Sequence, residues 1–117
     1  MRRSEFEEVV DEALEDLPPW VVDAVENLHV VVENRPTGEQ DPHGEGVLGI
    51  YEGVSLLDRG VDYSGYLPDR IVVFMRPHLD LGLSLADLKA EIRTTVLHEV
   101  AHHLGIDDDR LTELGWD

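Results

Sequence analysis

Apolar residues near the N-terminus recur every three or four positions, which places them along one side of an α-helix. Ser4 and Glu7 stand in a capping-box spacing, and Pro18 and Pro19 break the pattern, so we expect a helix from Ser4 to about Asp16. The apolar stripe of this helix consists of Phe6, Val9, Val10, Ala13, Leu14 and Leu17. This stripe predicts the face that packs on the core.

A second short helix over Trp20–Leu28 is expected to lead into three strands rich in β-branched residues. The predicted strands are His29–Asn34, Val47–Gly53 and Arg70–Arg76. The last has apolar residues on both faces, as expected for a sheet covered by helices. Residues 35–46 contain two Pro and three Gly, so they predict a loop, which is either a mobile connection or one wall of a cleft.

A long helix is expected from the capping pair Ser84 and Asp87 through Leu104. Its apolar residues occupy a broad arc and should form the centre of the core: Leu88, Ile92, Val96, Leu97, Val100 and Leu104. We expect residues 109–116 to form a last helical turn. The pattern therefore indicates a single α+β domain over residues 1–117, with a short mixed sheet of about three to four strands packed on the long C-terminal helix and on N-terminal helices.

Composition narrows the classes of function. The chain has 26 acidic and 9 basic residues and a formal net charge of −17, which repels nucleic acid and anionic lipid and attracts cations or basic peptides. It has no cysteine, so only histidines and carboxylates are available as metal ligands. No apolar run approaches the roughly 18 residues of a membrane span, and the N-terminus lacks a secretory apolar stretch, so we expect a cytoplasmic protein.

The strongest indication of function is the pattern HExxHxxGxxD over residues 98–108. On an α-helix, His98 and His102 are one turn and about 40° apart, so both imidazoles can reach one metal ion. Glu99 then lies beside that metal, where its carboxylate can take a proton from metal-activated water. This combination predicts hydrolytic zinc chemistry.

The third ligand is expected after the helix ends. If the helix continued, Asp108 would lie about 9 Å further along the axis than His102 and could not reach the metal. Gly105 can adopt the left-handed conformation at a helix C-terminus and turn the chain back, which makes Asp108 a plausible third ligand. Three protein ligands leave one position open for water, as in catalytic zinc sites. Other carboxylates that compete for this role, or cap the final turn instead, are Asp107, Asp109 and Glu113.

The segment Leu67–Trp116, with LPDRIVVFMRP followed by LHEVAHHLGIDDDRLTELGW, resembles the small bacterial zincin-like metallopeptidases with a minimal metalloprotease domain, also called Asp-zincins. The resemblance implies a zincin-like fold and peptide hydrolysis. It also implies that His98, His102 and Asp108 bind zinc and that Glu99 is the catalytic acid/base. The larger metzincins have a third His where Asp108 stands and a methionine-containing turn; only nine residues, none of them methionine, follow Asp108 here.

These observations predict a zinc-dependent peptidase that acts on a peptide or protein substrate, not on nucleic acid or at a membrane. The substrate is expected to add as a strand to an exposed sheet edge, for which Val47–Gly53 is the candidate. Glu91 and Thr95 lie on the helix face of the zinc ligands and are candidate supports for an imidazole, and His103 is expected to pack or to play such a supporting role. Candidate donors to the developing oxyanion are Tyr63, Tyr66, His43, His78 and Arg76.

Two rival functions remain open at this point. One is a metal-dependent ribonuclease like the bacterial rRNA-maturation endonucleases, which also place metal ligands at i, i+4 and i+10. Those enzymes have His at the last position and no counterpart of Glu99, and the acidic charge disfavours an RNA partner. The other is a zinc-binding regulatory or interaction module without turnover.

Overall fold

The structure is a computed structural model that describes residues 1–24, 28–53 and 69–114, and at Asp23, Ala24, Asp108 and Leu114 it describes the backbone only. The elements follow one another as α1 (Arg3–Glu15), α2 (Pro19–Ala24), β1 (His29–Glu33), β2 (Gly49–Glu52), β3 (Arg70–Phe74), α3 (Met75–Leu79), α4 (Leu85–Leu104) and α5 (Asp108–Leu114). This arrangement confirms the predicted α+β class.

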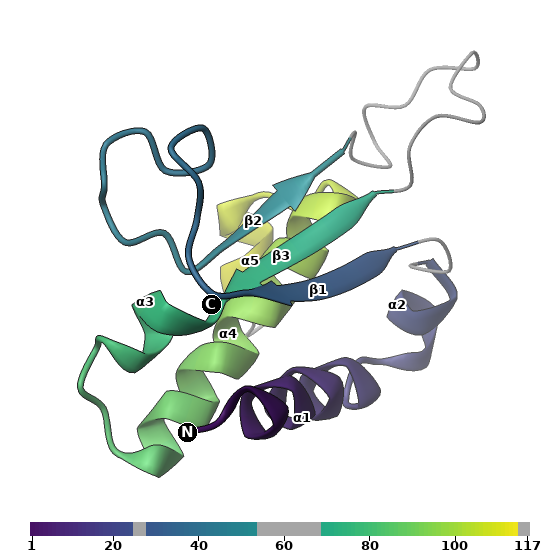
Figure 1. Cartoon of the computed structure of the whole chain (residues 1–117). Coiled ribbons are helices and arrows are strands. Elements are labelled where there is room, and N and C mark those ends of the chain that lie inside the picture. Colours follow the sequence, from purple (N-terminus) through teal and green to yellow (C-terminus); the bar gives the residue numbers. More distant parts are fainter. Residues whose placement is uncertain (25–27, 54–68, 115–117) are drawn as a thin grey trace.

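The described strands form a mixed three-stranded sheet in the order β1-β3-β2 (Figure 1). β1 is parallel to β3, with Val31 opposite Val72, and β2 is antiparallel to β3, with Ile50 opposite Val72. β3 is central, and its residues Ile71 to Phe74 are all buried, as its apolar pattern predicts. β2 lies at an edge of the described sheet.

Helices α1 and α4 pack against each other, and α4 also contacts β2 and β3 (Figure 1). The core between these helices and the sheet consists of Phe6, Val9, Val10, Ala13, Leu17, Val21, Val32, Ile71, Val73, Leu88, Ile92, Val96 and Val100. The predicted stripes of the first and the long helix supply most of it, while Leu14, Leu97 and Leu104 are partly buried at its margin. Burial of this apolar surface is the main source of stability.

The first helix begins earlier than the predicted capping box. α1 starts at Arg3, so Ser4 lies inside its first turn and does not cap it. Instead the N-cap is Arg2, whose backbone N–H donates to Glu5 Oε1 at 3.4 Å. The second helix is described over Pro19–Ala24, and Leu28 lies outside it; residues 25–27 of the predicted range are outside the described residues.

One helix was not predicted. The predicted strand Arg70–Arg76 ends at Phe74, and α3 begins directly after it. Pro77 stands in the first turn of α3, where a backbone N–H has no partner within the helix, so proline is well suited to this position. α4, in contrast, begins as predicted, because Ser84 Oγ accepts a hydrogen bond from the backbone N–H of Asp87 at 3.2 Å.

Within the described residues, no helix combines the length and the apolar character that crossing a bilayer requires.

Candidate metal centre

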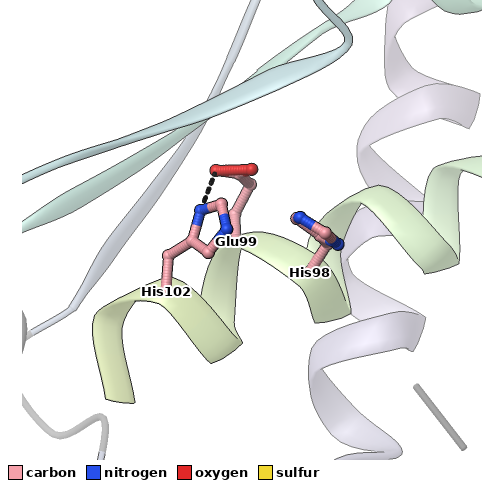
Figure 2. A group of neighbouring side chains, drawn as sticks. All are labelled: His98, Glu99 and His102. Atoms are coloured by element: carbon pink, nitrogen blue, oxygen red, sulfur yellow. Dashed lines mark ion pairs between the residues drawn. The ribbon is translucent and has the colours of Figure 1, made fainter. Parts of the chain in front are cut away.

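The last two turns of α4 bring together three side chains that can bind a metal. His98, Glu99 and His102 each offer a ligand atom, and these atoms lie within 4.8 Å of one another (Figure 2). The two imidazole rings have centroids 4.6 Å apart and meet edge to face. The spacing of four residues places both rings on one side of the helix, as expected from the sequence.

Glu99 is the most unusual residue of this group. It is 6% exposed, and among the described residues its Oε2 atom has no hydrogen-bond partner. His102 Nδ1 lies 3.5 Å from this oxygen and forms an ion pair with it when the imidazole is protonated (Figure 2). Burial raises the pKa of the Glu99 carboxyl to about 7, and the neighbouring His98 partly offsets this increase.

This geometry fits a bound cation. A buried carboxylate oxygen without a hydrogen bond is costly, and a positive ion beside it removes that cost. Two imidazoles and carboxylates are donors that zinc accepts readily, and the chain has no thiolate to offer instead. His98, Glu99 and His102 therefore form a candidate metal centre.

Strand β2 crosses α4 next to this centre. A Cβ atom added to Gly49 would lie 2.8 Å from Thr95 Cγ2, 3.1 Å from the Val72 carbonyl oxygen and 3.4 Å from Glu99 Cγ. Only glycine allows the strand to approach the helix this closely. A cleft of about 300 Å³ opens between the two elements, lined by Leu48, Gly49, Glu91, Thr94, Thr95, His98 and Glu99.

The chain turns back after α4 as predicted. Gly105 has φ 77° and ψ 23°, the left-handed conformation, and the Ile106 N–H donates to the Ala101 carbonyl at 2.9 Å. α5 then begins at Asp108, the predicted third ligand. The side chain of Asp108 is outside the described part of the structure, so its role as a ligand stays a prediction.

Two of the competing carboxylates are engaged elsewhere. Asp107 Oδ1 accepts a hydrogen bond from the Arg110 backbone N–H at 2.9 Å, which caps the start of α5. Glu113 is paired with the Arg110 guanidinium at 2.7 Å on the surface. Asp109 is exposed.

Beside the metal group lies a buried polar network that the sequence did not indicate. His103 Nδ1 is 2.9 Å from Asp69 Oδ2, with both side chains at most 3% exposed, and the Tyr51 hydroxyl donates to the same oxygen at 2.9 Å. A Cβ atom added to Gly53 would lie 2.4 Å from Asp69 Oδ1. The network ties the end of α4 to β2 and to the start of β3, and it buries His103, in agreement with the packing role that was one of its two predicted roles.

Thr95 does not support a zinc-ligand imidazole among the described residues, but bonds a different histidine. Its hydroxyl donates to the Glu91 carbonyl at 3.0 Å and lies 2.8 Å from Nε2 of the buried His78. His78 Nδ1 is 2.7 Å from the Phe74 carbonyl. Both ring nitrogens of His78 are thus occupied, which disfavours it as an oxyanion donor.

Two of the other proposed oxyanion donors, Arg76 and His43, have other surroundings in the described structure. Arg76 forms an ion-pair contact with Asp80 at 3.8 Å, and His43 is exposed in the loop before β2. Tyr63 and Tyr66 lie outside the described residues.

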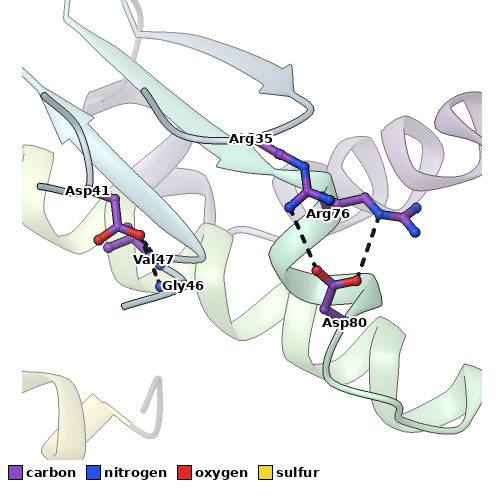
Figure 3. A network of polar contacts seen from close by, with 6 residues as sticks. All are labelled: Arg35, Asp41, Gly46, Val47, Arg76 and Asp80. Atoms are coloured by element: carbon purple, nitrogen blue, oxygen red, sulfur yellow. Dashed lines mark hydrogen bonds and ion pairs between the residues drawn. The ribbon is translucent and has the colours of Figure 1, made fainter. Parts of the chain in front are cut away.

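The loop of residues 35–46 lines a different depression from the cleft at Glu99. Asp41 holds this loop together, because its carboxylate accepts hydrogen bonds from the N–H group of Glu45 and from those of Gly46 and Val47. Figure 3 shows the bonds from Gly46 and Val47. Arg35 and Arg76 both contact Asp80 of the α3 region (Figure 3). The loop thus packs toward α3, and the segment that borders the cleft is Leu48–Gly49.

Residues 25–116 match the sequence profile of the family described as zincin-like metallopeptidase. The chain belongs to this family. The match includes β1, β2, β3 and all of α4, so the candidate centre lies in the part that defines the zincin-like domain. The family implies a metal cofactor, typically zinc, which agrees with the donor set of the described residues.

A solved structure supports the fold. The chain is similar to a conserved hypothetical protein from Thermus thermophilus, with 27% sequence identity, a TM-score of 0.59, and coverage of 99% of this chain and 100% of the other. No curated protein matches the chain.

Proposed function

We propose that this zincin-like protein is a zinc-dependent peptide hydrolase in which Glu99 is the general acid/base. The observation that supports this most strongly is the buried Glu99 carboxylate, whose Oε2 has no hydrogen bond among the described residues and which lies next to two imidazoles on adjacent turns of α4. A surface helix that carried two histidines by chance would not need to bury a carboxylate beside them. The zincin-like family favours peptidase chemistry over the ribonuclease alternative.

His98 and His102 would hold the zinc ion, and Asp108 is our proposed third ligand. A zinc ion in this position supplies a Lewis acid that acidifies water and polarises a carbonyl group. The Glu99 carboxylate takes a proton from the attacking water and later delivers it to the leaving amine. A general base works best when its pKa lies near the working pH, and burial gives Glu99 that tendency.

We further propose that the peptide substrate binds along β2. This strand pairs with β3 on one side, and its other side is an edge of the described sheet. Its residue Gly49 lies directly over Thr95 and Glu99 of α4, so a strand added beside β2 would pass the metal centre. The substrate would therefore be an extended peptide.

The test is hydrolysis of a quenched peptide library by zinc-loaded protein and by the Glu99→Gln variant with its zinc content measured. We expect cleavage by the wild type and a loss of at least about 100-fold in kcat/KM in the variant, with zinc retained. Zinc binding without cleavage in either protein would contradict the enzyme and support a zinc-binding module. Cleavage of RNA oligonucleotides would instead support the ribonuclease.

A further inference from the structure

We propose that the cleft beside the metal centre accepts a lysine or arginine side chain of the substrate and that Glu91 selects it. The inference rests on the proposed peptidase function and names its substrate class. It makes Glu91 a residue that determines specificity, with no part in the chemistry of hydrolysis.

The cleft extends along α4 from the metal group to Glu91. Glu91 lies seven residues before His98, which is two turns and about 10 Å along the same face of the helix. An extended peptide advances about 3.3 Å per residue, so a long side chain close to the scissile bond can span this distance. The cleft between Glu91 and His98 is lined by the short side chains of Thr94 and Thr95, which leave space for a substrate side chain.

The charge of Glu91 is not neutralised by the described residues. The side chain is half-buried, and no ion pair to it is formed within the described part of the chain. The basic residues of α4 lie elsewhere: Lys89 and Arg93 line a separate depression against α1, and Arg93 is paired with Asp16 at 2.7 Å. Burial lowers the pKa of the His78 imidazole more than the charge of Glu91 raises it, which disfavours a cationic His78 as the partner of Glu91.

Lysine and arginine fit the composition of the cleft. Their hydrocarbon stems can lie along Leu48 and the threonine methyl groups, while the cationic end reaches the Glu91 carboxylate. An acidic side chain would meet two carboxylates there and a net charge of −17 over the whole molecule. The same field favours the approach of basic peptides.

The experiment uses one quenched peptide in three forms that differ at a residue flanking the scissile bond, with Lys, Gln or Glu, and repeats the set for the residue on the other side. For the wild type, kcat/KM is expected to be about fivefold to tenfold higher for Lys than for Gln on one of the two sides. In Glu91→Gln this ratio is expected to fall to about one, and Glu91→Lys is expected to favour the Glu peptide. Glu15→Gln, which removes an exposed charge on α1, is the matched control and should keep the wild-type ratio.

Binding of the same peptides to zinc-loaded Glu99→Gln protein, followed by fluorescence anisotropy, separates this inference from the proposed function. The Lys peptide should bind more tightly than the Gln peptide, and adding Glu91→Gln should remove the difference. Cleavage without a Lys preference, or a preference that persists in Glu91→Gln, overturns the inference and leaves the peptidase intact. Selective binding that depends on Glu91, without cleavage, overturns the peptidase and leaves the selectivity of the cleft intact.

Discussion

At the scale of single residues, the candidate metal centre contains a carboxyl group whose burial opposes folding. Within the described part of the chain, Oε2 of the buried Glu99 has no hydrogen bond, although burying a carboxylate without a partner is costly. His103 and Asp69 show the contrast, because they are equally buried but paired at 2.9 Å. The difference supports our proposal that a bound cation compensates the Glu99 carboxylate.

The Glu99 carboxyl should make the metal-free protein less stable as the pH rises. Its pKa is raised from 4.5 to about 7, so between these values the folded state binds more protons than the unfolded state, and the free energy of unfolding falls with increasing pH. The Glu99→Gln variant has a neutral side chain at this position and lacks this pH-dependent contribution to the free energy of unfolding. At pH 8 we expect it to be more stable than the metal-free wild type by up to about 3 kcal/mol.

Urea unfolding of both metal-free proteins between pH 4 and pH 8 measures this difference. Titrating groups that do not interact with Glu99, such as the buried His78, contribute to both proteins and cancel. We expect the difference to grow over the range from about pH 4.5 to 7 and to become constant above it. A difference that is independent of pH would contradict the raised pKa of Glu99.

At the scale of elements, the contact between β2 and α4 sets the width of the site. Gly49→Ala should destabilise the protein by about 1 to 3 kcal/mol, because the new methyl group would lie 2.8 Å from Thr95 Cγ2 and 3.1 Å from a carbonyl oxygen of β3. Thermal unfolding measures the effect. Gly38→Ala is the matched control, since nothing lies within 4 Å of its Cβ position. Equal stability of the two variants would mean that β2 does not press on α4.

The elements also show what the sequence could predict. α4, its Ser84 cap and the Gly105 turn follow from local signals that act within one or two turns, and all three are confirmed. The predicted end of the third strand at Arg76 was wrong, because β3 ends at Phe74 and α3 begins at Met75. The apolar run continues from Phe74 into Met75, so the sequence pattern does not mark this change from strand to helix. Helix ends depend on which backbone groups find partners, which a periodic pattern does not specify.

The candidate site likewise has a part that the sequence could predict and a part that it could not. His98, Glu99 and His102 lie within five consecutive residues of one helix, so the helix alone brings them together. Tyr51, Asp69 and His103 come from three parts of the chain, and no local pattern shows that they meet. Likewise, the cleft that reaches Glu91 exists only because Leu48 and Gly49 cross α4 in the folded protein.

At the scale of the whole molecule, the net charge of −17 and the buried carboxylate both favour a bound cation. Self-repulsion among the acidic residues opposes the compact state, and an ion that binds only the folded protein stabilises it by mass action. For a chain of this size, the metal is expected to contribute directly to the free energy of folding. On this proposal, the same residues of the candidate metal centre contribute to both the stability and the function of the protein.

The most direct measurement of the central claim is a zinc titration against a competing chelator for the wild type, His98→Ala, His102→Ala and Glu99→Gln. We predict one zinc ion per chain in the wild type and in Glu99→Gln, and a loss of about 100-fold or more in affinity in each histidine variant. Zinc binding that is absent from the wild type, or that is equally tight after removal of either imidazole, would contradict the account.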